Sequence, residues 1–188
     1  MHNIEPFYNW LHLYKTENDL NSPLYSKHAI RDAYSNTIYG YLIHPEWDEI
    51  GSETLYLKIL YADYKESYVI IELLGEWNDC INNDIMFFKR KIIDKFIYSG
   101  IDKFIIIGEN ILNFHFSSDD YYEEWFQDLE DGWIAFLNFR KHILDEFSKF
   151  NLDFYINYGG ILDVFEWRKL SPKILFKNVK DVLSHRLK

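Results

Sequence analysis

Between residues 54 and 158, β-rich apolar runs alternate regularly with segments of helical period. The alternation opens with the runs TLYLKILYADY and YVIIELL, which only KES separates, a spacing typical of an antiparallel hairpin. Because the second run is apolar almost throughout, it predicts a strand buried on both faces.

From Asn83 the apolar residues recur at helical spacing, with Asn82 or Asn83 able to cap the helix and Gly100 able to end it. Further along, KFIIIG, WIAFLNF and DFYINYGG predict strands, and SSDDYYEEWFQDL and RKHILDEFSKF predict helices. This order predicts an α/β fold in which a mixed sheet, an antiparallel hairpin followed by parallel strands, carries helices on both faces.

Capping signals refine two of these helices. Ser117 and Asp120 have the spacing of a capping box before the acidic helix. Ser171 and Pro172 are suited to cap and begin a last helix.

The chain of 188 residues has the length of a single domain. After Pro6, Phe7, Trp10, Leu11 and Tyr14 follow helical spacing and predict a short helix. Residues 36–43 have strand composition interrupted by a glycine. We therefore expect an N-terminal helix, loop and possible edge strand over residues 1–50, a core over 54–158 and C-terminal helices over 160–188.

Charge and composition exclude several functions. A formal net charge of -10 opposes nucleic-acid binding, which depends on cations that neutralise phosphates. The single cysteine, Cys80, excludes an internal disulfide and fits a reducing compartment. We expect a soluble, cytoplasmic protein without membrane contact, because the sequence has neither a signal peptide nor a long apolar run. The common nucleotide, hydrolase and metal motifs are absent, so no cofactor is predicted.

The most economical place for a site follows from two similar stretches, LLGEWND and IIGEN. If parallel strands end just before Gly75 and Gly108, Glu76 and Glu109 emerge at the same edge of the sheet, where ligands bind in open α/β sheets. Two facing carboxylates suit general acid and base chemistry or a divalent cation, and His115 suits proton transfer. Acidic residues that cap helices are the alternative interpretation.

The same edge should carry further polar and aromatic side chains that contact a ligand. Trp77 either stacks on this ligand or covers the sheet end. The predicted ligand-binding residues are Trp77, Asn78, Asp79, Asn110, Asn138, Arg140 and Tyr158, with Gly159 and Gly160 beside them.

Two segments of opposite charge could support self-association. The stretch SSDDYYEEWFQDLED has no basic residue, whereas cations predominate from Arg168 to Lys188. A solvated helix face explains the acidic stretch, and a metal site is its alternative. The alternative ligands are Asp119, Asp120, Glu123 and Glu124.

The βαβ order of YVIIELLG, FIIIGEN and WIAFLNF between Tyr68 and Gly160 resembles that of STAS domains, the anti-sigma-factor antagonist type. In that family a phosphorylatable Ser or Thr commonly opens the helix after a central strand. The corresponding turns here read GEWND and GENIL, without a hydroxyl. Ser117 and Ser118 lie further along the chain.

Two functions remain. The first is a non-enzymatic regulatory module that binds a protein partner or a small ligand, which the absent catalytic motifs favour. The alternative is a small carboxylate-dependent or metal-assisted hydrolase with its site at the strand carboxyl ends, which the placement of Glu76 and Glu109 favours.

Overall fold

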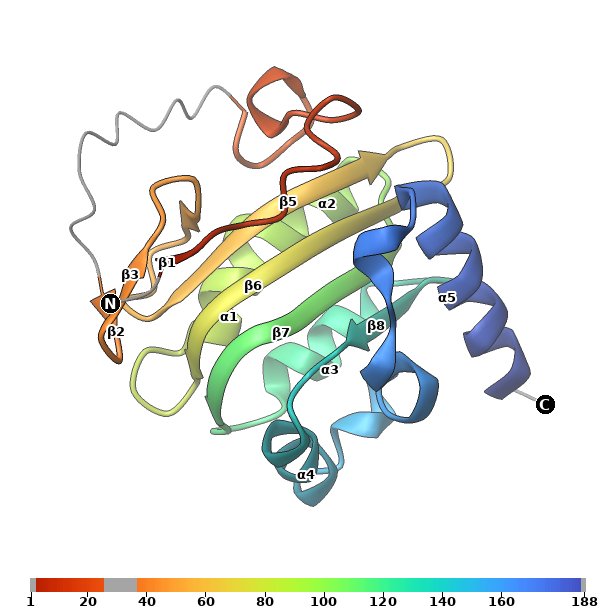
Figure 1. Ribbon diagram of the computed structural model, residues 1–188. Helices are drawn as coiled ribbons and strands as arrows, with labels where there is room; N and C mark the ends of the chain where they lie inside the picture. The colour runs from red at the N-terminus through yellow and green to blue at the C-terminus, as the bar shows by residue number, and fades with distance from the viewer. Residues whose placement is uncertain (1–2, 26–36, 187–188) are drawn as a thin grey trace.

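The computed structural model describes residues 3–25 and 37–186, which form a large twisted sheet, a small sheet and flanking helices (Figure 1). The large sheet has the strand order β4-β5-β6-β7-β8. The pairs β4·β5 and β5·β6 are antiparallel, whereas β6·β7 and β7·β8 are parallel. This confirms the predicted mixed sheet. The strands are β4 (Asp48–Glu49), β5 (Leu55–Asp63), β6 (Tyr68–Asn78), β7 (Lys103–His115) and β8 (Trp133–Leu137).

One face of the large sheet packs against four helices. These are α1 (Asp84–Phe88), α2 (Asp94–Tyr98), α3 (Asp120–Gln127) and α4 (Lys141–Lys149), and a π-helical segment (Lys89–Ile93) joins α1 to α2. Their apolar positions form the main core with alternate residues of the strands, such as Val69, Ile71 and Phe104. The apolar side chains at helical spacing thus pack against the apolar side chains on one face of the strands, as the sequence predicts.

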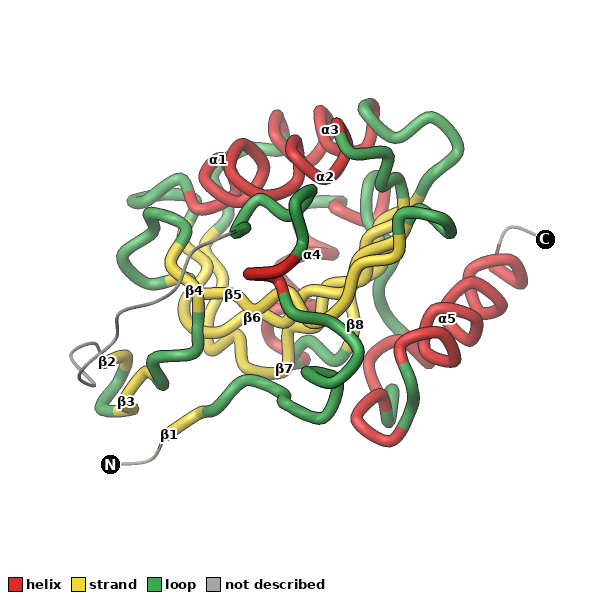
Figure 2. The backbone as a smooth tube through the Cα atoms, turned by 90° about the horizontal axis from the view of Figure 1, so that it is seen from above, coloured by secondary structure: helices red, strands yellow, loops and turns green. Residues whose placement is uncertain are grey.

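The opposite face packs against α5 (Pro172–Arg186) and against the chain around Trp10 and around Trp167. Figure 2 shows α5 on the other side of the sheet from α1, α2 and α3, which confirms helices on both faces. Phe176 of α5 stacks on Tyr68 with 4.0 Å between ring centroids. The helix begins at Pro172 as predicted. Arg186 is the last described residue, so Lys188 lies outside the described part of the chain.

The small sheet has the order β1-β3-β2. Its strands are β1 (Asn3–Ile4), β2 (Thr37–Ile38) and β3 (Tyr41–Ile43). The predicted strand over 36–43 is therefore a hairpin from residue 37, with Tyr39 and Gly40 in its turn at φ 48° and 80°. Asn36 lies outside the described residues. Ile38, Ile43 and Trp47 pack against Tyr56 and Leu74 of the large sheet.

Strands β6 and β7 are longer than predicted, because Gly75 and Gly108 lie inside them rather than at their ends. The register shifts between Glu72 and Leu74, and again between Gly75 and Glu76. Such shifts are typical of β-bulges, which redirect side chains without ending a strand. The glycines are needed for close packing: a Cβ on Gly75 would lie 2.0 Å from the carbonyl oxygen of Thr54.

Three local predictions are wrong. Residues 7–14 form hydrogen-bonded turns, with a 3-10 turn at Thr16–Asn18, instead of a helix. The segment DFYINYGG contributes one bridge, from Asn157 to Ala135, rather than a strand, and the chain around it forms 3-10 turns. Helix α3 has Asp119 at its N-cap without a side-chain cap, so the Ser117–Asp120 capping box does not form. The 3-10 turns are Leu152–Phe154, Gly160–Val164 and Trp167–Lys169.

Candidate functional site

The carboxyl ends of β6 and β7 bring two predicted site residues together. Glu76 Oε1 lies 2.9 Å from Nε2 of His115. Tyr39 of the small sheet donates its hydroxyl to the other carboxylate oxygen of Glu76 at 2.7 Å, and this hydrogen bond raises the pKa of Tyr39. Asn113 Nδ2 lies 3.0 Å from the same His115 nitrogen. The two strands pair Glu76 with Asn113 and Asn78 with His115, so the register itself positions this cluster.

A shallow pocket of about 370 Å³ lies beside the cluster, where the small sheet meets the end of β7 and the start of α4. Arg140, which precedes the first residue of α4, and Asn113 of β7 are its polar lining residues with a cationic and an amide side chain. The pocket combines aromatic, aliphatic, amide and cationic groups, and its lining residues are Ile4, Tyr39, Tyr41, Leu112, Asn113 and Arg140. Arg140 is exposed and forms no salt bridge with the described part of the chain. This arrangement can accept a small anion.

Glu109 lies elsewhere, so the two predicted carboxylates do not face each other. Its carboxylate accepts hydrogen bonds from Arg168 and, at 3.2 Å, from the indole of Trp167. Both partners belong to the C-terminal segment on the α5 side of the sheet. Glu109 continues the series of Ile105 and Ile107, which face that side, and after the register shift Asn110 also donates to Glu72, at 3.2 Å.

Glu72 is a buried acid that the sequence reasoning did not single out. Its side chain is 0 % exposed, and burial raises its pKa to about 7. In the sequence, Glu72 stands out as the single charged residue of the apolar run YVIIELL, which indicates a buried acid. A charged residue in a strand that is buried on both faces needs polar partners, and the tertiary structure identifies them.

The end of β6 and the turn after it have a structural role. Trp77 is fully buried in the main core, where it packs against Phe88 and Phe114. Asp79 accepts hydrogen bonds from the indole of Trp77, from the backbone N–H of Ile85 and from the hydroxyl of Tyr122. Burial raises the pKa of Asp79 to about 6 despite these donors. Asn78 is also buried, and its Oδ1 accepts the N–H of Ile81 at 2.9 Å.

Two other predicted ligand-binding residues contact the protein itself. Asn138 has φ 57° and exchanges two hydrogen bonds of 2.8 Å with the backbone of Phe165. Tyr158 packs its ring against Phe147, and its hydroxyl lies 3.3 Å from that of Ser148. Of the seven predicted ligand-binding residues, Arg140 is therefore the one that lines the pocket.

The acidic helix α3 pairs with the π-helical segment rather than facing water along its whole length. Lys89 is buried and contacts the carboxylates of Asp94, Glu124 and Asp128. Arg90 forms a bidentate salt bridge with Glu124. Of the four acids in the predicted alternative metal site, Asp119, Asp120, Glu123 and Glu124, it is Glu124 that belongs to this cluster, which surrounds the ammonium group of Lys89.

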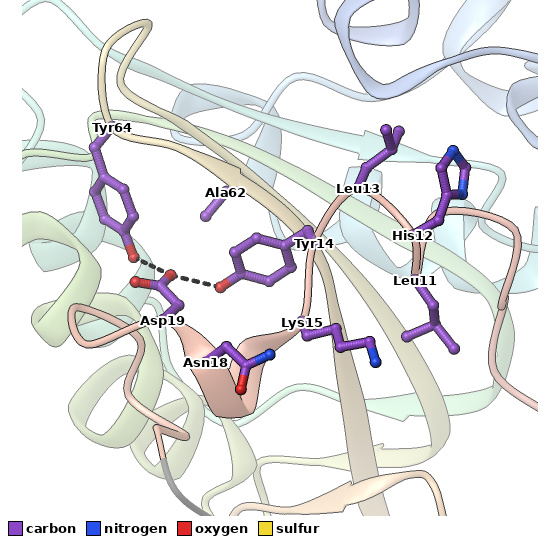
Figure 3. A pocket seen from close by; sticks show the side chains of 9 residues that line it. All are labelled: Leu11, His12, Leu13, Tyr14, Lys15, Asn18, Asp19, Ala62 and Tyr64. Carbon is purple, nitrogen blue, oxygen red and sulfur yellow. Dashed lines mark hydrogen bonds between the residues drawn. The ribbon is translucent and has the colours of Figure 1, made fainter.

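A second hollow lies between the N-terminal segment and the β5–β6 hairpin (Figure 3). It is an open groove of about 690 Å³. Tyr14 and Tyr64 point toward each other and donate their hydroxyls to the same oxygen of Asp19, at 2.7 and 2.6 Å. Burial and the hydrogen bond to Asp19 raise the pKa of both tyrosines. These contacts fix the N-terminal segment against the hairpin, and they leave the groove without a free carboxylate for chemistry.

Comparisons with models of protein families, with curated proteins and with solved structures find no match to this chain. The resemblance to STAS domains stays a prediction. Among the described residues, no helix combines the length and the apolar character needed to cross a bilayer.

Proposed function

We propose that this protein is a non-enzymatic binding module whose pocket at the carboxyl ends of β6 and β7 takes a small organic anion. The observation that carries the proposal is Arg140, an exposed guanidinium without a salt-bridge partner among the described residues, at a pocket that also presents an amide and two phenol rings. A guanidinium recognises carboxylate or phosphate groups by paired hydrogen bonds.

Electrostatics favour one specific place for an anion. The chain carries a formal net charge of -10, so most of its surface repels anions. Glu76, to which Tyr39 of the pocket donates its hydroxyl, is also hydrogen-bonded to His115, so its carboxylate is engaged within the protein. The aromatic rings of Tyr39 and Tyr41 add apolar contact area, which favours an organic anion over an inorganic one.

The separation of the two predicted carboxylates supports binding over hydrolysis. Glu109 pairs with Arg168, and Glu76 pairs with His115, so neither acts with the other on a shared substrate. A cytoplasmic location and self-association through the acidic and basic segments are further predictions of the same proposal.

The test is a thermal-shift screen with inorganic phosphate, mono- and dicarboxylates and nucleotides, followed by calorimetric titration of those that raise the melting temperature. We expect Arg140→Gln to weaken binding by about tenfold or more, as expected for loss of a charge-assisted hydrogen bond. Lys141→Gln is the matched control, because Lys141 is the next residue and pairs with Asp145 outside the pocket. Equal loss in both variants, or no binding of any of these anions, would reject the proposal.

A second candidate function rests on the Glu76–His115 hydrogen bond. A carboxylate that orients an imidazole is the arrangement of a general base. Under this alternative, aryl ester or phosphoester probes would be hydrolysed by the protein, and His115→Gln would abolish the turnover while leaving anion binding to Arg140 intact.

A further inference from the structure

Two segments distant in sequence cross the α5 side of the sheet and meet at one carboxylate. The N-terminal strap (residues 7–10) donates the backbone N–H of Phe7 to Glu72 Oε2 at 2.9 Å. The C-terminal strap (residues 167–170) donates Nη2 of Arg168 to Glu72 Oε1 at 3.1 Å. The donors are 65 and 96 residues away from Glu72 along the chain. Glu72 is therefore the common contact of both straps.

The straps also hold each other. Trp10 donates its indole N–H to the carbonyl oxygen of Leu170 at 3.0 Å. The rings of Phe7, Trp10 and Trp167 pack edge to face, with centroid separations between 4.7 and 5.7 Å. The guanidinium of Arg168 lies over the rings of Phe7 and Trp167, 5.4 and 4.5 Å from their centroids. Together these contacts make a cover that excludes water from Glu72.

The charged groups that face Glu72 leave its negative charge incompletely compensated. Arg168 forms salt bridges with both Glu72 and Glu109, so it does not compensate Glu72 alone. The charge of Glu109 also repels that of Glu72. Lys58 lies opposite Glu72 on β5, but its ammonium is 3.5 Å from both Glu46 and Asp48. The N-terminal strap supplies a backbone N–H, Asn110 of β7 supplies a neutral amide N–H, and α5 packs on this face through apolar side chains. Removal from water is therefore the dominant influence on this carboxyl group.

We propose that the two straps form a proton-linked clasp over Glu72, which is closed most firmly while Glu72 is protonated and opens more readily once Glu72 is ionised. This inference is independent of the anion pocket. It assigns a conformational role to a buried acid that the proposed function does not use.

The direction follows from linkage. In the closed state burial raises the pKa of Glu72 to about 7, against the opposing hydrogen bond of Phe7 and charge of Arg168. When the straps open, water reaches the carboxylate and its pKa returns toward the ordinary value of 4.5. The closed state thus binds the proton more tightly, and its advantage is lost as the pH rises from about 4.5 through about 7. The opening equilibrium constant should increase by up to roughly 300-fold over this range.

The test is amide hydrogen exchange of both straps between pH 5 and pH 8, corrected for the intrinsic exchange rates. In the unaltered protein the protection of residues 7–10 and 167–170 should fall with rising pH by a factor on the order of 100. In Glu72→Gln the protection should not depend on pH. Glu166→Gln is the matched control, because it removes a carboxylate of 75 % exposure just before the C-terminal strap and should keep the pH dependence. Protection that is constant in the unaltered protein, or still pH-dependent in Glu72→Gln, would overturn the clasp.

A second measurement requires no variant. The N–H of Phe7 is hydrogen-bonded to the Glu72 carboxylate, so its chemical shift reports the ionisation of that group. We expect the Phe7 amide signal to titrate with a midpoint near pH 7, as the pKa of about 7 requires. A midpoint near the ordinary value of a glutamate, about 4.5, would contradict the proposal.

Discussion

The ammonium of Lys89 lies 2.7 Å from Oδ2 of Asp128, in the space enclosed by three carboxylates. Oxygen atoms of Asp94, Glu124 and Asp128 lie within 4.8 Å of one another, a spacing that also suits a cation with oxygen ligands. Burial opposes the charge of Lys89, but its hydrogen bonds to Asp128 and Asp94 outweigh burial and raise its pKa. The lysine thus occupies the position that a metal ion would take.

Lys89→Ala should convert this cluster into a weak calcium site. Without the ammonium, the contacts of Arg90 with Asp94 and Glu124 compensate the three carboxylates only in part, so a divalent cation should bind with a dissociation constant of roughly 0.1–1 mM, the range of weak oxygen-ligand sites. Calcium should raise the melting temperature of Lys89→Ala and leave that of the unaltered protein unchanged. Lys141→Ala, which breaks an exposed pair with Asp145, is the control and should gain no calcium response.

Asp79→Asn should stabilise the protein at alkaline pH. The pKa of Asp79 is raised from 3.8 to about 6 in the folded state, so its contribution to stability is greatest below pH 3.8 and falls as the pH rises through 6. Asparagine keeps an acceptor for Trp77 and Ile85 without the buried charge. Urea unfolding at pH 8 should show a gain of up to about 3 kcal/mol, which disappears at acidic pH.

Asp79→Ala provides the contrast, because it removes the acceptor as well as the charge. The donors of Trp77, Ile85 and Tyr122 would then be unsatisfied in the core, and we expect a loss of about 2–4 kcal/mol. If Asp79→Asn and Asp79→Ala destabilised the protein equally at pH 8, the buried charge of Asp79 would not be what costs stability there.

Gly75→Ala should destabilise the fold strongly. The new Cβ would lie 2.0 Å from a backbone oxygen of Thr54, and the residue has φ 116°. Overpacking and the unfavourable backbone conformation together should cost about 2–5 kcal/mol in chemical denaturation. Gly100→Ala is the matched control, because its φ is 88° but its Cβ would meet open space. The free energy of unfolding of this control should fall by only about 1–2 kcal/mol.

Asn138 should prove to be a structural residue. It combines a left-handed backbone conformation with two hydrogen bonds to the Phe165 backbone. Asn138→Gly keeps the conformation and loses the hydrogen bonds, whereas Asn138→Ala loses both. In urea unfolding, the free energy of unfolding of Asn138→Ala should therefore be lower than that of Asn138→Gly by about 1 kcal/mol. If Asn138 instead contacts a ligand, both variants would keep their stability and lose binding.

Part of the candidate site could be predicted from the sequence. Glu76 and His115 lie near the carboxyl ends of β6 and β7, Arg140 follows β8, and parallel strands bring their carboxyl ends to one edge. The structure places Glu76 next to His115 and Arg140 beside the pocket. Asn113 and Tyr39 were missed, because the first lies in a strand predicted to end earlier and the second belongs to the small sheet.

Local patterns in the sequence predict the order and the type of the core elements. Apolar spacing is a local property, so the hairpin, the helices after Asn83 and Arg140 and the start of α5 at Pro172 could be recognised without knowing any contact. The mixed sheet with helices on both faces follows from that order and from the short connections.

The ends of the strands and the pairing of the charged groups depend on tertiary contacts. Gly75 and Gly108 look locally like turn residues, but they are bulge positions because Thr54 and Phe139 pack closely against them from elsewhere in the chain. Phe7 and Arg168 reach Glu72 across 65 and 96 residues. Residues 7–14 have helical spacing, yet the contacts of Phe7 and Trp10 with the sheet face hold the backbone in turns. Such contacts depend on packing between distant segments, which periodicity does not encode.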